Sequence, residues 1–137
     1  METKLVIVTG APATGKTTVA RALVQHLGYA LISKDDVKES LANVLGSGDR
    51  ERSRQLGAAA YAVMQRLASR MLDERVNVIL EANFWRERSE SWLRALAHGR
   101  DAPVIVCAVT PELRRERFRA RSAAGERHAV HLDGQIP

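Results

Sequence analysis

The chain has 137 residues, of which 45% are hydrophobic and 27% are charged, and its formal net charge is +5. This length suits one small domain with a single core. No apolar run is long enough to cross a bilayer, and the single cysteine, Cys107, excludes an internal disulfide. The sequence therefore predicts one domain, residues 1–137, in a reducing cytoplasm and without a membrane anchor. The basic charge suits phosphate-bearing ligands and is also compatible with nucleic acid.

The first predicted strand, residues 4–9, leads into the strongest motif of the chain. Residues 10–18 read Gly-Ala-Pro-Ala-Thr-Gly-Lys-Thr-Thr, which fits the phosphate-binding loop G-x-x-x-x-G-K-[ST]. A helix is expected from about Thr18 to Leu27, and Gly28 is a typical helix stop. Strand, loop and helix follow in the order that phosphate binding needs, because glycines let backbone N–H groups and a helix N-terminus surround the anion.

Two side chains of this loop are expected to act beyond simple binding. Lys16 is a candidate catalytic residue, because its mobile charge can reach the β- and γ-phosphates. The Thr17 hydroxyl is placed to bind Mg²⁺. The full set of expected nucleotide contacts is Gly10, Ala13, Thr14, Gly15, Lys16, Thr17 and Thr18.

The elements that follow alternate between strands and helices. Cys107, in the last apolar run, is expected to be a buried core thiol. Strict alternation predicts a three-layer α/β/α domain with a parallel sheet of strand order 2-3-1-4. The apolar stripes of the second and third helices are expected to include Val44 and Leu45, and Val63 and Leu67. The expected strands are 30–33, 77–81 and 103–109, and the expected helices are about 36–45, 50–74, 87–98 and 111–121, with a loop from 122.

The residues after each strand are candidates for the site, because ligands of parallel sheets bind beyond the carboxyl ends of the strands. Asp35 follows the second strand and is the candidate general base, since a kinase must orient an acceptor hydroxyl and take its proton. Asp35 is also a candidate to reach the metal through water. The alternative role of Asp35 is to cap the next helix, and capping is the expected role of Asp36.

A second group of polar residues follows the third predicted strand. Glu81 ends that strand, where an acid could hold Mg²⁺ or its waters or bind substrate, and where the alternative is a solvated strand end. Asn83 and Arg86 are weaker candidate substrate contacts, because loops at this edge are often polar for no special reason. Phe84 and Trp85 could form a substrate wall or belong to the core.

The last predicted helix is rich in arginine. It begins with Thr110 as the expected N-cap and Pro111 at the first helical position. Arg117 and Arg121 lie four residues apart and therefore share one helix face. As catalytic residues they would neutralise the charge that develops near the β–γ bridge, whereas the alternative is a solvated basic face.

These stretches together resemble small P-loop kinases of the group that includes chloramphenicol phosphotransferase, zeta toxins and polynucleotide 5′-kinase. The resemblance implies that Asp35 is the catalytic base, that Lys38 is a substrate-side basic residue, and that Arg117 and Arg121 belong to a lid of about residues 111–133. Such kinases usually continue into a fifth strand and a last helix, so a truncated chain or an open adenine side is expected. The matching stretches are 10–18, 32–38, 78–84 and 117–121, and 125–133 resembles the end of a lid.

Two functions of different classes are compatible with these observations. The first is ATP- and Mg²⁺-dependent transfer of the γ-phosphate to a hydroxyl of a small molecule or a nucleic-acid end. The second is a nucleotide-binding switch or NTPase without an acceptor. Asp35 favours the enzyme, because a switch needs no base, and the guanine-reading motif N-K-x-D is absent. Nucleic-acid ends, nucleosides, sugars and antibiotics all stay open as acceptors, since no RNA- or DNA-binding module is recognisable.

Overall fold

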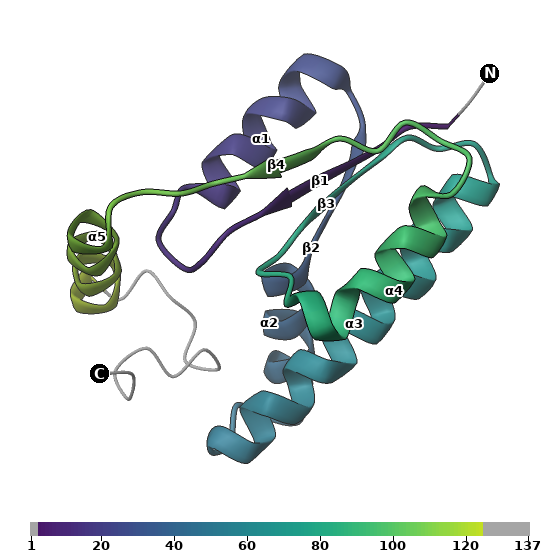
Figure 1. Cartoon of the computed structure of the whole chain (residues 1–137). Helices are drawn as coiled ribbons and strands as arrows, with labels where there is room; N and C mark the ends of the chain where they lie inside the picture. Colours follow the sequence, from purple (N-terminus) through teal and green to yellow (C-terminus); the bar gives the residue numbers. More distant parts are fainter. Residues whose placement is uncertain (1–2, 125–137) are drawn as a thin grey trace.

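The protein is described by a computed structural model over residues 3–124, which form a parallel four-stranded sheet with helices on both faces (Figure 1). The strand order is β2-β3-β1-β4, and each pair of neighbours is parallel. The predicted three-layer α/β/α class and sheet order are therefore confirmed. In chain order, the elements are β1 (Leu5–Thr9), α1 (Lys16–Leu27), β2 (Ala30–Ser33), α2 (Lys34–Leu45), α3 (Arg50–Asp73), β3 (Val78–Glu81), α4 (Arg86–Ala97), β4 (Val104–Val106) and α5 (Pro111–Ala124).

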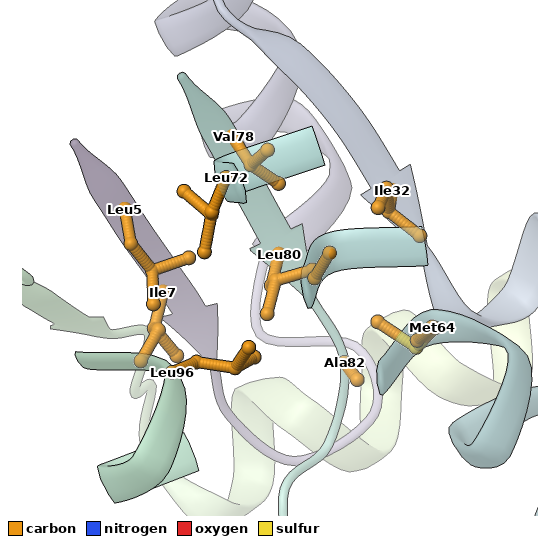
Figure 2. Close-up of a cluster of buried hydrophobic side chains, with 10 residues drawn as sticks. Leu5, Ile7, Ile32, Met64, Leu72, Val78, Leu80, Ala82 and Leu96 are labelled. Carbon is orange, nitrogen blue, oxygen red and sulfur yellow. The ribbon is translucent and has the colours of Figure 1, made fainter. Parts of the chain in front are cut away.

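The central strands β1 and β3 are apolar on both faces because helices cover both faces. The register pairs Leu5 with Val78 and Ile7 with Leu80. These four side chains form one core with α3 and α4, and Figure 2 shows them converging with side chains from both helices. On the opposite face a second core packs against α1; its buried members are Val6, Val8, Ala20 and Ile79.

Helix α3 buries a narrower stripe than the sequence predicts. Val63 and Leu67, which were expected in the stripe, are 37% and 41% exposed, because they lie beside the helix face that meets the sheet. Small residues on the buried face let α3 approach its neighbours closely. The buried side chains recur at every fourth residue: Leu56, Ala60, Met64, Ala68 and Leu72.

Helix α2 begins earlier than predicted. It starts at Lys34, directly after β2, with Ser33 as its N-cap residue. Asp35 and Asp36 therefore lie in the first turn of the helix, where the positive end of its dipole favours negative charge. The capping role expected for Asp36 is wrong.

The buried face of α2 also differs from the prediction. Val44 and Leu45 are 83% and 54% exposed, whereas Lys38 and Ala42 are buried. The cause is the packing of α2 against α3, which turns the Lys38 side of the helix inward. A basic residue therefore occupies a position in the helix interface where an apolar stripe was expected.

The carboxyl-terminal elements differ from the prediction in length. Strand β4 covers only three residues, and Val104 and Val106 are 56% and 67% exposed, since β4 lies at the edge of the described sheet. Cys107 is half-buried against the α1 core and is not fully enclosed. Helix α5 extends through Ala124, beyond its expected end at residue 121. The expected lid end, residues 125–133, lies outside the described residues, and no helix within residues 3–124 is suited to span a membrane.

Candidate active site

The loop between β1 and α1 has an unusual backbone that matches its motif. Gly10, Ala13 and Gly15 have φ angles of 150°, 64° and 91°. A Cβ at Gly10 would overlap the Cys107 carbonyl oxygen and would lie 2.8 Å from Thr14 Oγ1, so only glycine fits there. Ala13 holds a left-handed conformation that alanine rarely adopts, and such strain concentrates at functional sites.

Hydrogen bonds inside the loop fix its curvature and start the helix. Thr14 Oγ1 donates to the Ala11 carbonyl oxygen at 2.7 Å, and Lys16 Nζ donates to the same oxygen at 3.3 Å. Gly15 is the N-cap of α1 and has no side chain to bond the first N–H groups of the helix. Those N–H groups and the positive end of the helix dipole therefore face the loop, an arrangement that can hold a phosphate anion.

A threonine and a buried acid meet beside the loop. Thr17 Oγ1, in the first turn of α1, donates to Glu81 Oε1 at 3.0 Å. Glu81 ends β3 and is only 3% exposed, so the alternative of a solvated strand end is wrong. Burial raises the pKa of Glu81, while the Thr17 hydrogen bond and the Lys16 charge oppose this shift and the nearby acids Asp35 and Asp36 add to it.

The chemistry of this pair fits Mg²⁺. The Thr17 hydroxyl gives its hydrogen to Glu81, so its oxygen lone pairs can face a cation. Magnesium beside phosphates takes one or two protein oxygens and keeps several waters, which Glu81 can hydrogen-bond. A cation would also balance the buried negative charge of Glu81, which Lys16 and the Thr17 hydroxyl offset in part.

Asp35 lies near this acid, in the first turn of α2. Ser33 pairs with Glu81 in the sheet, and this pairing places the first turn of α2 beside the end of β3. Asp35 is half-buried, and its negative charge raises the pKa of both Glu81 and Tyr61. The charge of Asp35 therefore acts both on Glu81, beside the phosphate loop, and on Tyr61, in the neighbouring helix α3.

A pocket of about 730 Å³ opens between α2, α3 and α4 at this end of the sheet. One wall is tied to the phosphate loop, because the Phe84 N–H donates to Thr9 Oγ1 at 3.1 Å, one residue before Gly10. The predicted contacts Lys38 and Asn83 both line the pocket. Most of its other large side chains are basic or aromatic: Lys34, Arg50, Arg54, Arg88, Tyr61, Trp85 and Trp92.

The two aromatic residues of the β3–α4 loop have different surroundings. Phe84 packs against the core, with its ring 6.0 Å from that of Tyr61 and 5.7 Å from that of Trp92 between centroids. Trp85 is 56% exposed and lines the pocket. The sequence left a core role and a wall role open for this pair. Phe84 belongs to the core, and Trp85 belongs to the pocket wall.

Tyr61 is a central residue of the pocket that the sequence analysis missed. Its hydroxyl donates to the Asn83 carbonyl oxygen and so joins α3 to the β3–α4 loop. Burial, together with the negative charge of Asp35, raises the pKa of Tyr61 to about 12, although Arg88 opposes the shift. The hydroxyl therefore keeps its proton near neutral pH. A sequence signal was present, because Ser53, Gly57 and Tyr61 follow one another at four-residue spacing on one side of α3.

Three predicted site residues are not brought to the loop by any described contact. Arg117 is exposed on α5, which follows the carboxyl end of β4 (Figure 1). Arg86 begins α4 and Arg121 lies in α5, but their side chains lie outside the described part of the structure. Thr110 is the expected cap of α5, since its Oγ1 accepts the Leu113 N–H at 3.2 Å. The catalytic role of the arginines stays a prediction.

Comparison with known sequences identifies a family. The profile of a family described as an AAA domain matches residues 5–135. An uncharacterized protein of Mycobacterium tuberculosis strain H37Rv is 29% identical over 130 residues, covering 87% of this chain and 26% of that protein. The chain thus spans about a quarter of the length of the mycobacterial proteins that it matches.

Comparison with solved structures agrees with the sequence match. The crystal structure of a candidate kinase from Chloroflexus aurantiacus has a TM-score of 0.91 and 36% identity, covering 96% of this chain and 72% of that one. A chain of the Pnkp1/Rnl/Hen1 RNA repair complex has a TM-score of 0.68 and 21% identity, covering 90% of this chain and 39% of that one. The second similarity is one of fold alone.

Proposed function

The chain belongs to the AAA domain family whose profile spans residues 5–135, with a P-loop kinase fold, and we propose that it transfers the γ-phosphate of ATP to a hydroxyl group. The observation that carries this proposal is the pocket of about 730 Å³, which opens at the same end of the sheet as the phosphate loop. Asp35 lies in α2, the helix that forms one wall of this pocket, and its charge acts on Glu81 beside the loop and on Tyr61 in the pocket. A switch or simple NTPase needs the loop but has no use for a second, acceptor-sized pocket beside it.

The phosphate loop and its lysine would bind and orient the nucleotide. Backbone N–H groups of residues 10–18 would surround the phosphates, and Lys16 would move from the Ala11 carbonyl oxygen to the β- and γ-phosphates. Thr17 and Glu81 would hold Mg²⁺, the first directly and the second through water. When bound, Mg²⁺ supplies positive charge that neutralises the transferring phosphoryl group.

Asp35 would serve as the general base for the acceptor. In the transfer, the acceptor oxygen forms a bond to the γ-phosphorus while the bond to the bridging oxygen of ADP breaks, and the hydroxyl proton passes to the Asp35 carboxylate. Its position in the first turn of α2, beside β3, supports contact with an acceptor in the pocket. Arg117 and Arg121 of α5 would stabilise the transferring charge as part of a lid.

The test is transfer of label from [γ-³²P]ATP to a panel of nucleosides, sugars, oligonucleotide 5′ ends and hydroxyl-bearing antibiotics. We expect labelled product from at least one acceptor class, dependent on Mg²⁺ and on Asp35. Tight ATP binding with no labelled acceptor, together with an Asp35→Asn variant that behaves like the wild type, would instead support the nucleotide-binding switch.

A further inference from the structure

We propose that the acceptor carries a phosphate or carboxylate group, which Lys34 and Lys38 bind beside Gly57 in the pocket between α2 and α3. The inference rests on the proposed phosphotransfer function and specifies the acceptor of the same site. Gly57, Lys34 and Lys38 thereby receive a binding role. Of these three residues, only Lys38 is expected from the sequence to face a substrate.

Gly57 is the first observation. It lies in the interior of α3, a helix of 24 residues, where glycine is less favourable than alanine. The residue is buried and lines the pocket. A Cβ at this position would meet no backbone, because its nearest neighbours are Lys34 Nζ and Lys38 Nζ, each at 3.9 Å. The helix therefore needs no glycine for packing, and the missing side chain leaves room next to two ammonium groups.

The two lysines are the second observation. They lie one turn apart on α2 and direct their ammonium groups to the same point on α3. Lys38 is only 7% exposed and donates to Ser53 Oγ at 2.9 Å, and Lys34 Nζ lies 5.5 Å from the centre of the Tyr61 ring. An ammonium group has three donors, so the bond to Ser53 does not by itself prevent Lys38 from also donating to an oxyanion. Two charge-assisted donors converging on one point form a suitable site for a phosphate or carboxylate.

The charge of the whole pocket is the third observation. Among the described residues that line it, five are basic and none is a carboxylate. One of the five, Arg54, lies at the exposed rim and pairs with Glu51 at 3.3 Å. Such a lining favours a negatively charged ligand and disfavours a cationic one. The exposed Trp85 ring and the Trp92 ring offer an apolar wall for the rest of the acceptor.

The two tryptophans of the chain, Trp85 and Trp92, both line this pocket and give a direct readout of binding. We would saturate the phosphate loop with Mg²⁺ and AMPPNP and follow tryptophan fluorescence during titration at constant ionic strength. The probes are phenyl phosphate, benzoate and benzyl alcohol, which share a ring and differ in charge. We expect both anions to bind more tightly than the alcohol, and their order distinguishes a phosphate from a carboxylate acceptor.

Variants test whether the binding depends on this subsite. Lys34→Met and Lys38→Met should each weaken the anionic probes about 10- to 100-fold and leave benzyl alcohol unchanged. Arg70→Met is the matched control, because Arg70 is an exposed basic residue of α3 that pairs with Glu74 outside the pocket. Gly57→Ala should raise the Tm, since alanine favours the helix, and yet weaken the anions, because its methyl group takes up space beside both ammonium groups.

The outcomes separate this proposal from the function on which it rests. Equal binding of benzyl alcohol and the anions, or anion binding that is unchanged in Gly57→Ala and in both lysine variants, overturns the anionic acceptor even if phosphotransfer is found. Lysine-dependent anion binding without transfer to any hydroxyl overturns the kinase function and leaves an anion-binding site. Transfer to glycerol 3-phosphate or glycerate, but not to glycerol, supports both.

Discussion

Thr17 and Glu81, joined by a hydrogen bond of 3.0 Å, connect the first turn of α1 to the end of β3. The bond places a buried carboxylate against the residue that follows the phosphate-loop lysine. A carboxylate in such a position is costly for the folded chain, because burial outweighs its favourable contacts and raises its pKa. A cation bound with nucleotide would balance this charge, so stability, pH and Mg²⁺ should be linked at Glu81.

We therefore expect Glu81→Gln to be more stable than the wild type near neutral pH. A carboxyl whose pKa is raised on folding holds its proton more tightly in the folded chain. It favours folding below its ordinary pKa of 4.5, and this contribution is lost as the pH rises through the raised value. The glutamine amide of the variant can still accept the Thr17 hydrogen bond but does not titrate. Thermal unfolding from about pH 4 to about pH 7 should show a Tm difference that grows with pH in favour of the variant.

Addition of Mg²⁺ and ATP should change this comparison. A cation beside Glu81 favours the ionised carboxylate, so the ligands should raise the Tm of the wild type more than that of Glu81→Gln. A Tm difference that is independent of pH, and ligand shifts that are equal in the two proteins, would show that Glu81 is not the linked group.

Thr17→Ala should raise the Mg²⁺ requirement without abolishing nucleotide binding. The substitution removes a hydroxyl whose lone pairs can face the cation and leaves the backbone N–H groups of the loop in place. We expect the Mg²⁺ concentration for half-maximal transfer to rise by about tenfold or more. Ser40→Ala is the control, because it removes an exposed hydroxyl of α2 that bonds within its own helix turn to the Asp36 carbonyl oxygen. An identical Mg²⁺ titration of Thr17→Ala and the wild type would refute the assignment.

Tyr61→Phe should lower the free energy of unfolding by about 1 kcal/mol, because the Asn83 carbonyl oxygen loses the hydrogen bond that the Tyr61 hydroxyl donates to it. The substitution keeps the ring, so the contact with Phe84 is preserved. Urea unfolding measures the change, and Tyr29→Phe, at the other tyrosine of the chain, controls for loss of a hydroxyl on the α1 side of the sheet. If Tyr61→Phe were as stable as Tyr29→Phe, the bond to the β3–α4 loop would contribute nothing.

Substitution of the adjacent acids Asp35 and Asp36 should have different effects on the rate of phosphotransfer. Both lie in the first turn of α2, but Asp35 is half-buried and acts on Tyr61, whereas Asp36 is exposed. We expect Asp35→Asn to lower kcat by about two orders of magnitude or more with little change in the Kd of ATP. Asp36→Asn should stay near the wild type. If the two variants lost activity equally, Asp35 would not be the base, and Glu81 would be the next candidate.

Local patterns account for the parts of the fold that the sequence predicted. The phosphate loop is one continuous motif, and strict alternation of strands and helices with right-handed crossovers leaves few sheet orders, so both were predicted correctly. The burial of Glu81 depends instead on where α1 packs over the end of β3, which sequence spacing does not contain. The role of Glu81 in the site was predicted from its place at the strand end, and that role stays a prediction.

The pocket between α2, α3 and α4 could be predicted only in part for the same reason. Asn83 was expected to contact substrate because it follows a strand in the chain, and Lys38 because the resemblance to small P-loop kinases implies it. Gly57 and Tyr61 come from the middle of a long helix, and they reach the pocket only because α3 packs against α2. The inward turn of Lys38 reflects the same packing, since a pattern of apolar residues does not reveal a buried lysine that bonds to a serine of another helix.

Transfer of labelled phosphate by the wild type and by Lys16→Ala tests the central claim most directly. Lys16 lies inside the phosphate loop and contributes no core packing, so Lys16→Ala should keep the fold, as circular dichroism and thermal unfolding would show. We expect wild-type protein to label a hydroxyl acceptor in the presence of Mg²⁺ and Lys16→Ala to be slower by at least about two orders of magnitude. A folded Lys16→Ala protein that labels the acceptor at the wild-type rate would contradict phosphotransfer at this loop.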